Sequence, residues 1–232
     1  MRLLAIDTSS LACSVALQVG DAVVQRHEEQ EREHTRLLVP MIREVLAEAG
    51  IETADLDAIV LGNGPGSFIG MRIAASVAQG LAHGAGLQIV PVSSLAAIAA
   101  EVLSSSDADE VVVTQDAHMN EVYLGAYRRG PGDLPQSLFA ERLHAQTAIE
   151  ELEEAHADKR VAAGFGWQRY PALLAANEDR IGQTSGVLYP HARYLLPMAA
   201  GMLENGLAID PKDLVPAYLR AKVAEKPGAV ES

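Results

Sequence analysis

The sequence predicts an α/β protein of two lobes, each built on a mixed β-sheet with flanking helices. Two observations predict this fold. A pattern of three strands followed by a helix opens the chain, and it begins again after the polar, aperiodic segment 104–110. In each half the first strand delivers an aspartate into a turn, Asp7 in one and Asp116 in the other. We therefore expect a first lobe at residues 1–104 and a second at 105–232.

The elements of the first half follow from short apolar runs, which predict strands, and from apolar residues three and four apart, which predict helices. Strands are expected at residues 3–6, 13–17, 22–28, 57–61 and 88–92. Helices are expected at about 34–49, 70–83 and 94–103. The first three strands follow one another directly and are antiparallel, whereas the later strands alternate with helices. This combination predicts a mixed sheet.

The second half repeats the pattern. Strands are expected at residues 111–115, 121–127, 137–143 and 160–163, and helices at about 147–155, 167–176 and 192–205. Two such lobes with a cleft between them describe the actin, sugar-kinase and Hsp70 (ASKHA) fold, in which the two aspartate turns face one another across a nucleotide-phosphate site. The residues expected to face this cleft are Asp7, Ser9, Ser10, Gly64, Gly66, Asp116, Gly164 and Gly166.

Composition and charge limit the function classes. The chain has 232 residues, of which 49% are hydrophobic, so sizeable cores can form. No apolar run is long enough to span a bilayer, and Cys13 is the only cysteine. One cysteine cannot form an intramolecular disulfide and fits a reducing compartment, so we expect a cytoplasmic protein. The net charge of −13 disfavours broad nucleic-acid binding through bulk electrostatics.

A glycine-rich loop joins the strand at 57–61 to the helix that follows. Gly62, Gly64, Gly66 and Gly70 let the backbone take positive φ and pass close to a phosphate or to another part of the chain. The loop is neither a P-loop nor a dinucleotide fingerprint, because its spacing and its following residues differ from both. Two interpretations stay open: a tight strand-to-helix turn with Ser67 as the helix cap, or an anion site at the helix N-terminus.

Two helices predict a protein partner. The helix at 34–49 carries two adjacent apolar rows, of which one suffices to cover the sheet. From Gly70 to His83 the only formally charged residue is Arg72. The residues expected at the interface are Leu37, Leu38, Met41, Ile42, Val45, Ile73, Ala74, Val77, Ala78 and Leu81. Without its partner the same face should pair with a second copy. The alternative is that both helices only cover the sheet.

Four segments carry a resemblance to a known family. They are Leu4-Ala5-Ile6-Asp7-Thr8-Ser9-Ser10, Gly64-Pro65-Gly66-Ser67-Phe68-Ile69-Gly70-Met71-Arg72, Asp116-Ala117-His118-Met119-Asn120-Glu121-Val122-Tyr123 and Pro216-Ala217-Tyr218-Leu219-Arg220. Over almost its whole length the chain resembles the TsaB (YeaZ) family of the bacterial tRNA threonylcarbamoyladenosine pathway. Ile69 departs from the family's usual Thr and removes a hydroxyl from the glycine loop.

The resemblance implies a two-lobed ASKHA fold and a non-catalytic subunit. Such a subunit pairs with TsaD, the catalytic paralogue, and works with the ATPase TsaE. The complex transfers threonylcarbamoyl from threonylcarbamoyl-adenylate to N6 of adenosine 37 in tRNA, so tRNA is met mainly through the complex. No cofactor of its own is implied, except for ATP or ADP at the complex interface.

The residues themselves argue against catalysis. The paralogue binds its metal through two histidines four apart, and the matching segment Pro91–Ile98 has Ser94 and Ile98 at those places. Neither is a good ligand for a transition metal. None of the seven histidines is three or four residues from another, and no Gly-x-Ser-x-Gly elbow is present. We expect no catalytic residue and no metal. The enzymatic alternatives are a small ASKHA-type ATPase or kinase, and a glycoprotease-like metallopeptidase.

Overall fold

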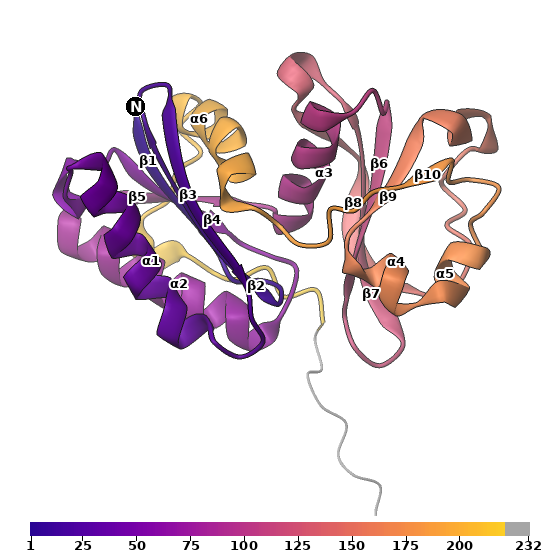
Figure 1. Cartoon of the computed structure of the whole chain (residues 1–232), viewed down its shortest axis with the longest axis horizontal. Helices are drawn as coiled ribbons and strands as arrows, with labels where there is room; N and C mark the ends of the chain where they lie inside the picture. Colours follow the sequence, from indigo (N-terminus) through magenta and orange to yellow (C-terminus); the bar gives the residue numbers. More distant parts are fainter. Residues whose placement is uncertain (221–232) are drawn as a thin grey trace, which may run out of the picture.

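The chain folds into two lobes that lie side by side, each with its own five-stranded sheet and helices (Figure 1). The computed structural model describes residues 1–220. The first sheet has the strand order β3-β2-β1-β4-β5 and the second has the order β10-β9-β6-β7-β8. The predicted two-lobed α/β fold is confirmed. None of the described helices is long and apolar enough to cross a membrane.

The first sheet is mixed, as the sequence predicts. Its strands are β1 (Arg2–Asp7), β2 (Ala12–Val19), β3 (Ala22–Glu29), β4 (Ala58–Gly62) and β5 (Gln88–Val92). The first three pair antiparallel, and β4 and β5 join parallel to β1. Every residue of β4 is buried and so are five of the six residues of β1, because helices cover both faces of the sheet.

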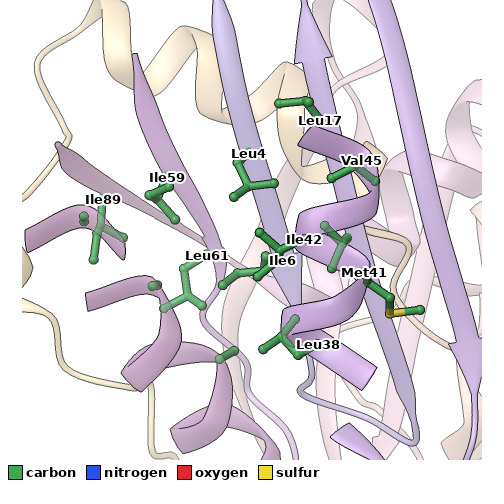
Figure 2. Close-up of a cluster of buried hydrophobic side chains, with 14 of the residues drawn as sticks. Leu4, Ile6, Leu17, Leu38, Met41, Ile42, Val45, Ile59, Leu61 and Ile89 are labelled. Carbon is green, nitrogen blue, oxygen red and sulfur yellow. The ribbon is translucent and has the colours of Figure 1, made fainter. Parts of the chain in front are cut away.

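One face of this sheet is covered by α1 (His34–Ala49) and α2 (Phe68–Ala85), with the short 3₁₀ helix η1 (Thr53–Asp55) between them in the sequence. Figure 2 shows the core that results, a cluster that gathers Ile42 and Val45 of α1 with Leu4 and Ile6 of β1 and Leu17 of β2. Ser67 accepts a hydrogen bond from the Gly70 N–H and so starts α2 two residues earlier than predicted. Gly86, with φ 68°, ends it.

The two apolar rows of α1 do not divide between the sheet and a partner. Leu38, Met41, Ile42 and Val45 are all buried inside the first lobe, and Leu37 is partly buried against the same core. The prediction that one row stays uncovered is therefore wrong. The helix lies in the angle between the twisted sheet and α2, where both rows find apolar neighbours.

The second sheet is also mixed. Its strands are β6 (Glu110–Asp116), β7 (Glu121–Arg129), β8 (Pro135–Ala145), β9 (Arg160–Ala163) and β10 (Gln183–Thr184). Short helices connect them: η2 (Pro131–Asp133), η3 (Glu154–Lys159), α4 (Phe165–Arg169) and α5 (Pro171–Ala175). The helix predicted at 167–176 is divided at Tyr170, where Pro171 starts a new helix.

The helix predicted at 147–155 is wrong. Turns and the start of η3 occupy this segment. The Asn177 side chain accepts a hydrogen bond from the Ile149 N–H at 2.8 Å and donates one to the Thr147 carbonyl at 3.1 Å. These bonds satisfy the backbone in a non-helical path, which local sequence cannot reveal.

Two helices are exchanged between the lobes. Helix α3 (Ser94–Ser105) packs on the second sheet, where Leu95 and Ile98 contact the core around Val111. Conversely η4 (Ala192–Leu195) and α6 (Leu196–Glu204) cover the free face of the first sheet (Figure 1). The expected boundary at residue 104 falls between the two sheets, whereas α3, which precedes it, packs on the second sheet and α6, which follows it, packs on the first. Each of these helices buries its apolar side against the sheet of the other lobe: α3 against the second sheet and α6 against the first.

The C-terminal segment also returns across the molecule. Ile209 pairs with Ile89 of the first lobe, the 3₁₀ helix η5 (Pro211–Asp213) follows, and Arg220 reaches Glu121 of the second lobe. Arg220, Lys222 and Lys226 are the basic residues clustered near the end of the sequence; Arg220 is in this segment, and Lys222 and Lys226 lie outside the described residues.

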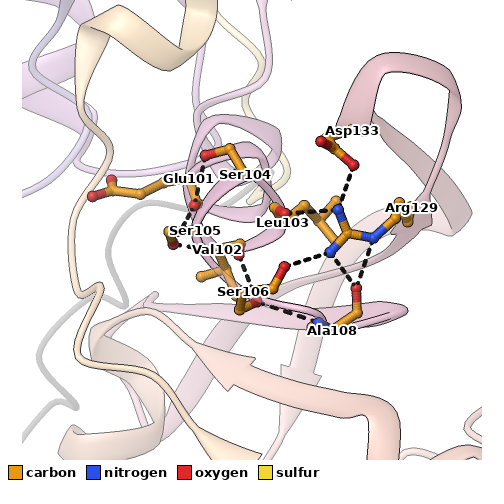
Figure 3. Close-up of polar contacts among 9 residues, drawn as sticks. All are labelled: Glu101, Val102, Leu103, Ser104, Ser105, Ser106, Ala108, Arg129 and Asp133. Carbon is orange, nitrogen blue, oxygen red and sulfur yellow. Dashed lines mark hydrogen bonds and ion pairs between the residues drawn. The ribbon is translucent and has the colours of Figure 1, made fainter.

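Arg129 of β7 fastens the far end of α3 (Figure 3). Its guanidinium donates hydrogen bonds to the carbonyls of Leu103, Ser106 and Ala108, at 2.7 to 3.0 Å, and pairs with Asp133. These carbonyls include one of the last turn of α3, which has no partner within the helix. A charged donor to several carbonyls is worth more than a neutral one.

We predict that Arg129→Met lowers the free energy of unfolding by about 2 kcal/mol, because the three carbonyls lose their donor. Urea denaturation followed by circular dichroism measures this. The matched control is Arg128→Met on the same strand, whose side chain is exposed; it should change stability by less than about 0.5 kcal/mol. Equal effects of the two changes would contradict the prediction.

Candidate functional site

Asp7, the first residue expected to face the cleft, is buried. It ends β1 with 1% of its surface exposed. Its Oδ1 accepts the Ser9 N–H and the Ser9 hydroxyl, both at 2.8 Å, and its Oδ2 accepts the Ser94 hydroxyl at 2.6 Å. Burial raises the pKa of this carboxyl, and the bonds from Ser94 and Ser9 partly oppose the rise. The prediction that Asp7 faces the cleft is therefore corrected: its side chain is a structural acceptor.

The places of the paralogue's metal ligands are occupied by packing residues. The Ser94 hydroxyl, besides donating to Asp7, accepts the Gly64 N–H at 3.1 Å. Ile98 is fully buried against the second sheet. These residues do not fit a metal. Elsewhere in residues 1–220 no group of three or more His, Cys, Asp or Glu side chains is arranged to hold one.

The glycines of the loop after β4 are required by a contact within the protein. The Ser67 N–H donates to the Ser9 carbonyl at 2.6 Å, so the loop lies directly on the β1–β2 turn. A Cβ at Gly66 would be 2.1 Å from the Ser9 carbonyl oxygen, and one at Gly70 would be 1.9 Å from that of Thr8. Of the two interpretations of this loop, the tight turn accounts for both glycines.

Gly164 and Gly166 have the same explanation in the second lobe. Gly164 has φ 94°, and a Cβ there would be 2.2 Å from the Thr114 carbonyl oxygen of β6. A Cβ at Gly166 would be 2.5 Å from the Thr114 hydroxyl. Neither glycine lines the cleft, but Phe165 between them does. The pair therefore brings the start of α4 against β6 and sets the position of Phe165.

A cavity of about 840 Å³ lies between the lobes, at the ends of β1 and β6. Of the residues predicted to face it, Ser9, Ser10, Gly66 and Asp116 line it, whereas Asp7, Gly64, Gly164 and Gly166 do not. The other lining side chains that bear on its chemistry are Arg32, His34, His118, Phe165, Arg169 and Tyr189. Sequence reasoning missed the two arginines, because no motif marks isolated arginines in separate loops.

Asp116 is held at the wall of the cavity by three groups. The Tyr170 hydroxyl donates to its Oδ1 at 2.7 Å, and the His118 N–H donates to the same oxygen at 2.8 Å. The His118 ring lies 3.4 Å from Oδ2. Partial burial and the adjacent carboxylate raise the pKa of Tyr170 to about 12, so its hydroxyl remains a donor.

The turn that carries His118 has an unusual backbone. His118, Met119 and Asn120 all have positive φ, at 60°, 52° and 60°. Non-glycine residues rarely adopt this region, and runs of three are rarer still. The turn places the His118 side chain, 83% exposed, at the cavity.

A groove runs between α1 and α2, which lie parallel with their N-termini at the interlobe cavity. It consists of two hollows, one of about 520 Å³ towards the N-termini of the two helices and one of about 610 Å³ towards their C-termini. From α2 it is lined by partly exposed Ile73, Val77 and Leu81 and by Gly80 and Gly84. Among the other residues predicted at the interface, Leu38 also lines the groove. Leu37 and the buried Met41, Ile42 and Val45 do not line it. Ala74 and Ala78 are fully buried within the first lobe. The groove therefore includes only Leu38, Ile73, Val77 and Leu81 of the residues predicted at the interface.

Comparison with known proteins decides the family. Residues 25–227 match the family model described as TsaD: tRNA N6-adenosine threonylcarbamoyltransferase. The chain is 37% identical to the tRNA threonylcarbamoyladenosine biosynthesis protein TsaB of Escherichia coli (strain K12), over 97% of each chain. The chain belongs to the TsaB (YeaZ) family. TsaB of Haemophilus influenzae is 35% identical over 97% of this chain and 96% of its own.

Solved structures agree with this membership of the TsaB family. YeaZ from Pseudomonas aeruginosa superimposes with a TM-score of 0.84 at 33% identity, covering 94% of this chain and 99% of its own. An uncharacterized protein with similarity to peptidase YEAZ, also from Pseudomonas aeruginosa, gives 0.83 at 34% identity over the same shares. The resemblance drawn from the four segments is confirmed.

The buried Asp7 makes a prediction about pH. An acid with a raised pKa in the folded state contributes stability at low pH and loses it as the pH rises from its ordinary pKa, 3.8, through the raised value. Asp7→Asn keeps the shape and removes the charge. We predict that the wild type loses stability relative to Asp7→Asn as the pH rises above about 4, because the pKa of the buried carboxyl is raised in the folded state.

Urea denaturation of both proteins at several pH values measures this difference. Asp7→Ala is the companion variant: it should lower the free energy of unfolding by about 3 kcal/mol, since it leaves Ser9 and Ser94 without their acceptor. A constant difference between wild type and Asp7→Asn at all these pH values would contradict the raised pKa of Asp7.

Proposed function

We propose that this chain is an accessory subunit of the cytoplasmic machinery that makes threonylcarbamoyladenosine in tRNA, and that it binds and activates a TsaD-like catalytic paralogue. Its TsaB relatives are named for this biosynthesis, which supports the pathway. The observation that supports a partner is the groove between α1 and α2, whose α2 wall is mostly apolar and includes Gly80 and Gly84. In this proposal a TsaE-like ATPase works with the complex of the two proteins, and tRNA binds mainly to that complex.

The groove is suited to binding a helix of another protein, because it exposes apolar side chains and allows close approach of a backbone. Gly80 and Gly84 have no atom within 4 Å of where a Cβ would be, so a foreign backbone can approach α2 closely there. Ile73, Val77 and Leu81 offer apolar surface, whose burial contributes about 25 cal/mol per Å² before the cost of association. A helix-in-groove contact uses these features together. Without the paralogue, a second copy of the chain covers the same groove by two-fold pairing.

We predict that Val77→Glu abolishes both binding to the paralogue and self-association, because it places an unpaired charge in the centre of the groove. Analytical ultracentrifugation of the chain, alone and with the purified paralogue, measures both. Val23→Glu is the matched control: Val23 is 38% exposed on β3, outside the groove, and the change should leave both associations intact.

Circular dichroism must show that both variants fold. A folded Val77→Glu protein that still dimerises and still binds the paralogue would move the interface away from this groove.

Enzymatic alternatives receive less support from the geometry. A kinase or ATPase of this fold would use the Asp7 carboxylate at its phosphate site, but that carboxylate is buried and accepts three hydrogen bonds inside the protein. A serine peptidase would need a free hydroxyl in the glycine loop, but Ser67 caps α2. A metallopeptidase would need ligands at the positions of Ser94 and Ile98.

Nucleotide binding without hydrolysis is a second proposal, supported by the interlobe cavity. The N-terminus of α2 and the first turn of α1 face it, as do Arg32 and Arg169. Helix N-termini and arginines attract phosphate, and Phe165 and Tyr189 offer rings for a base. We infer that ATP or ADP binds here when the paralogue closes the cavity.

Calorimetric titration with ATP tests this proposal. We predict weak or no heat with the chain alone and measurable binding with the paralogue present, reduced by about tenfold in Arg169→Met because one cation is lost. Equal affinity of the wild-type and Arg169→Met complexes would place the nucleotide elsewhere.

A further inference from the structure

Arg72 is the only formally charged residue of α2, and it lies at the wall of the groove beside Ile69, Ile73 and Val77. Its side chain is exposed, and within residues 1–220 it forms no ion pair; its contacts are with two aromatic rings. In a chain of net charge −13, most other described arginines are paired with nearby carboxylates, as Arg26 is with Glu44 and Glu48. Arg72 thus combines exposure, the absence of an ion pair and stacking on two aromatic rings, and this combination needs a reason.

The guanidinium of Arg72 is held in one orientation. Its Cζ lies 3.7 Å from the ring centroid of Phe68 and 5.7 Å from that of Tyr218. Its Nε donates a hydrogen bond to the Tyr218 hydroxyl at 2.9 Å. Stacking and this bond fix the side chain before any partner arrives, which lowers the entropic cost of binding. The terminal nitrogens Nη1 and Nη2 remain available, and together they match the two oxygens of a carboxylate.

Tyr218 is itself held in place from both lobes. The Asn63 side chain donates to the Val215 carbonyl at 3.1 Å, and the Ala217 N–H donates to the Asn63 carbonyl at 3.4 Å. Two residues later Arg220 forms an ion pair with Glu121 at 2.5 Å. Residues 214–220, here called the brace, are thus held by Asn63 of the first lobe and by Glu121 of the second, and they keep Tyr218 in contact with Arg72.

We propose that Arg72, positioned by Phe68 and Tyr218, determines specificity in the groove by binding an Asp or Glu side chain of the helix that enters it. This inference rests on the proposed function, in which that helix belongs to the catalytic paralogue. Charge complementarity carries it. A partner helix without an acid at this point would bury the guanidinium unpaired, which is costly, and one with a basic residue would be repelled. Arginine is also among the residues that most often dominate interface energies.

The experiment measures the affinity of the purified TsaD-like paralogue for the full chain at two salt concentrations. Arg72→Met should weaken binding about 30-fold and flatten its salt dependence. Tyr218→Ala, which leaves the charge but removes its support, should weaken binding about fivefold. Arg72→Lys keeps the charge and loses the two-pronged geometry, and should weaken binding about tenfold.

Arg43→Met is the matched control. Arg43 is exposed at the other half of the same groove and is not stacked between rings, so its loss should change the affinity by no more than about twofold. Thermal melting verifies that each variant folds; if Arg72→Met does not, Arg72→Lys and Tyr218→Ala decide.

The outcomes separate the two proposals. If Arg72→Met and Tyr218→Ala bind the paralogue as tightly as the wild type while Val77→Glu does not bind, the proposed role of Arg72 is wrong and the groove is still the interface. If Val77→Glu also binds, the groove itself is not the interface and the proposed function loses its main support. An equal loss in Arg43→Met and Arg72→Met would show general electrostatic attraction instead of a specific contact.

Discussion

The buried carboxylate of Asp7 joins the segments on which the first lobe depends. It accepts hydrogen bonds from Ser9 of the β1–β2 turn and from Ser94 at the start of α3, and Ser94 in turn accepts one from Gly64 of the glycine loop. An uncompensated buried carboxylate is far costlier than one lost hydrogen bond, so these segments must keep their positions together. A carboxylate used in this way inside the protein is not available to a substrate, which supports an accessory role for the chain.

The exchange of helices makes the two lobes interdependent. Helix α3 leaves the first sheet to cover the second, and α6 returns to cover the first. The crossings are fastened by specific bonds: the Ser14 hydroxyl accepts the Ala192 N–H at 2.8 Å, and His191 lies 2.7 Å from Glu101 of α3. The walls of the interlobe cavity are therefore set by the packing of both lobes, and a ligand or partner that moves one lobe must disturb these contacts.

The groove and the cavity meet at the start of α2, and this region concentrates the features that the protein presents to others. Ile69 lines both the cavity and the groove and is 70% exposed. One turn further along, Arg72 is stacked against the brace. A partner seated in the groove would thus lie close to the mouth of the cavity, so the proposed partner site and the proposed nucleotide site adjoin at the start of α2.

By itself the sequence determined the local elements and the family. The bounds of α1, the strands of the first sheet and the small, nearly uncharged character of α2 follow from periodicity, caps and composition, because these act over a few residues. Four motifs sufficed to identify the family. Periodicity reports that a side chain is buried but not what buries it. Only the tertiary structure decided that both rows of α1 pack inside the first lobe, that Asp7 turns inward to Ser94, and that α3 and α6 change lobes. The contact of Arg72 with Tyr218 joins residues 146 apart in sequence, and such a contact is formed only in the folded tertiary structure.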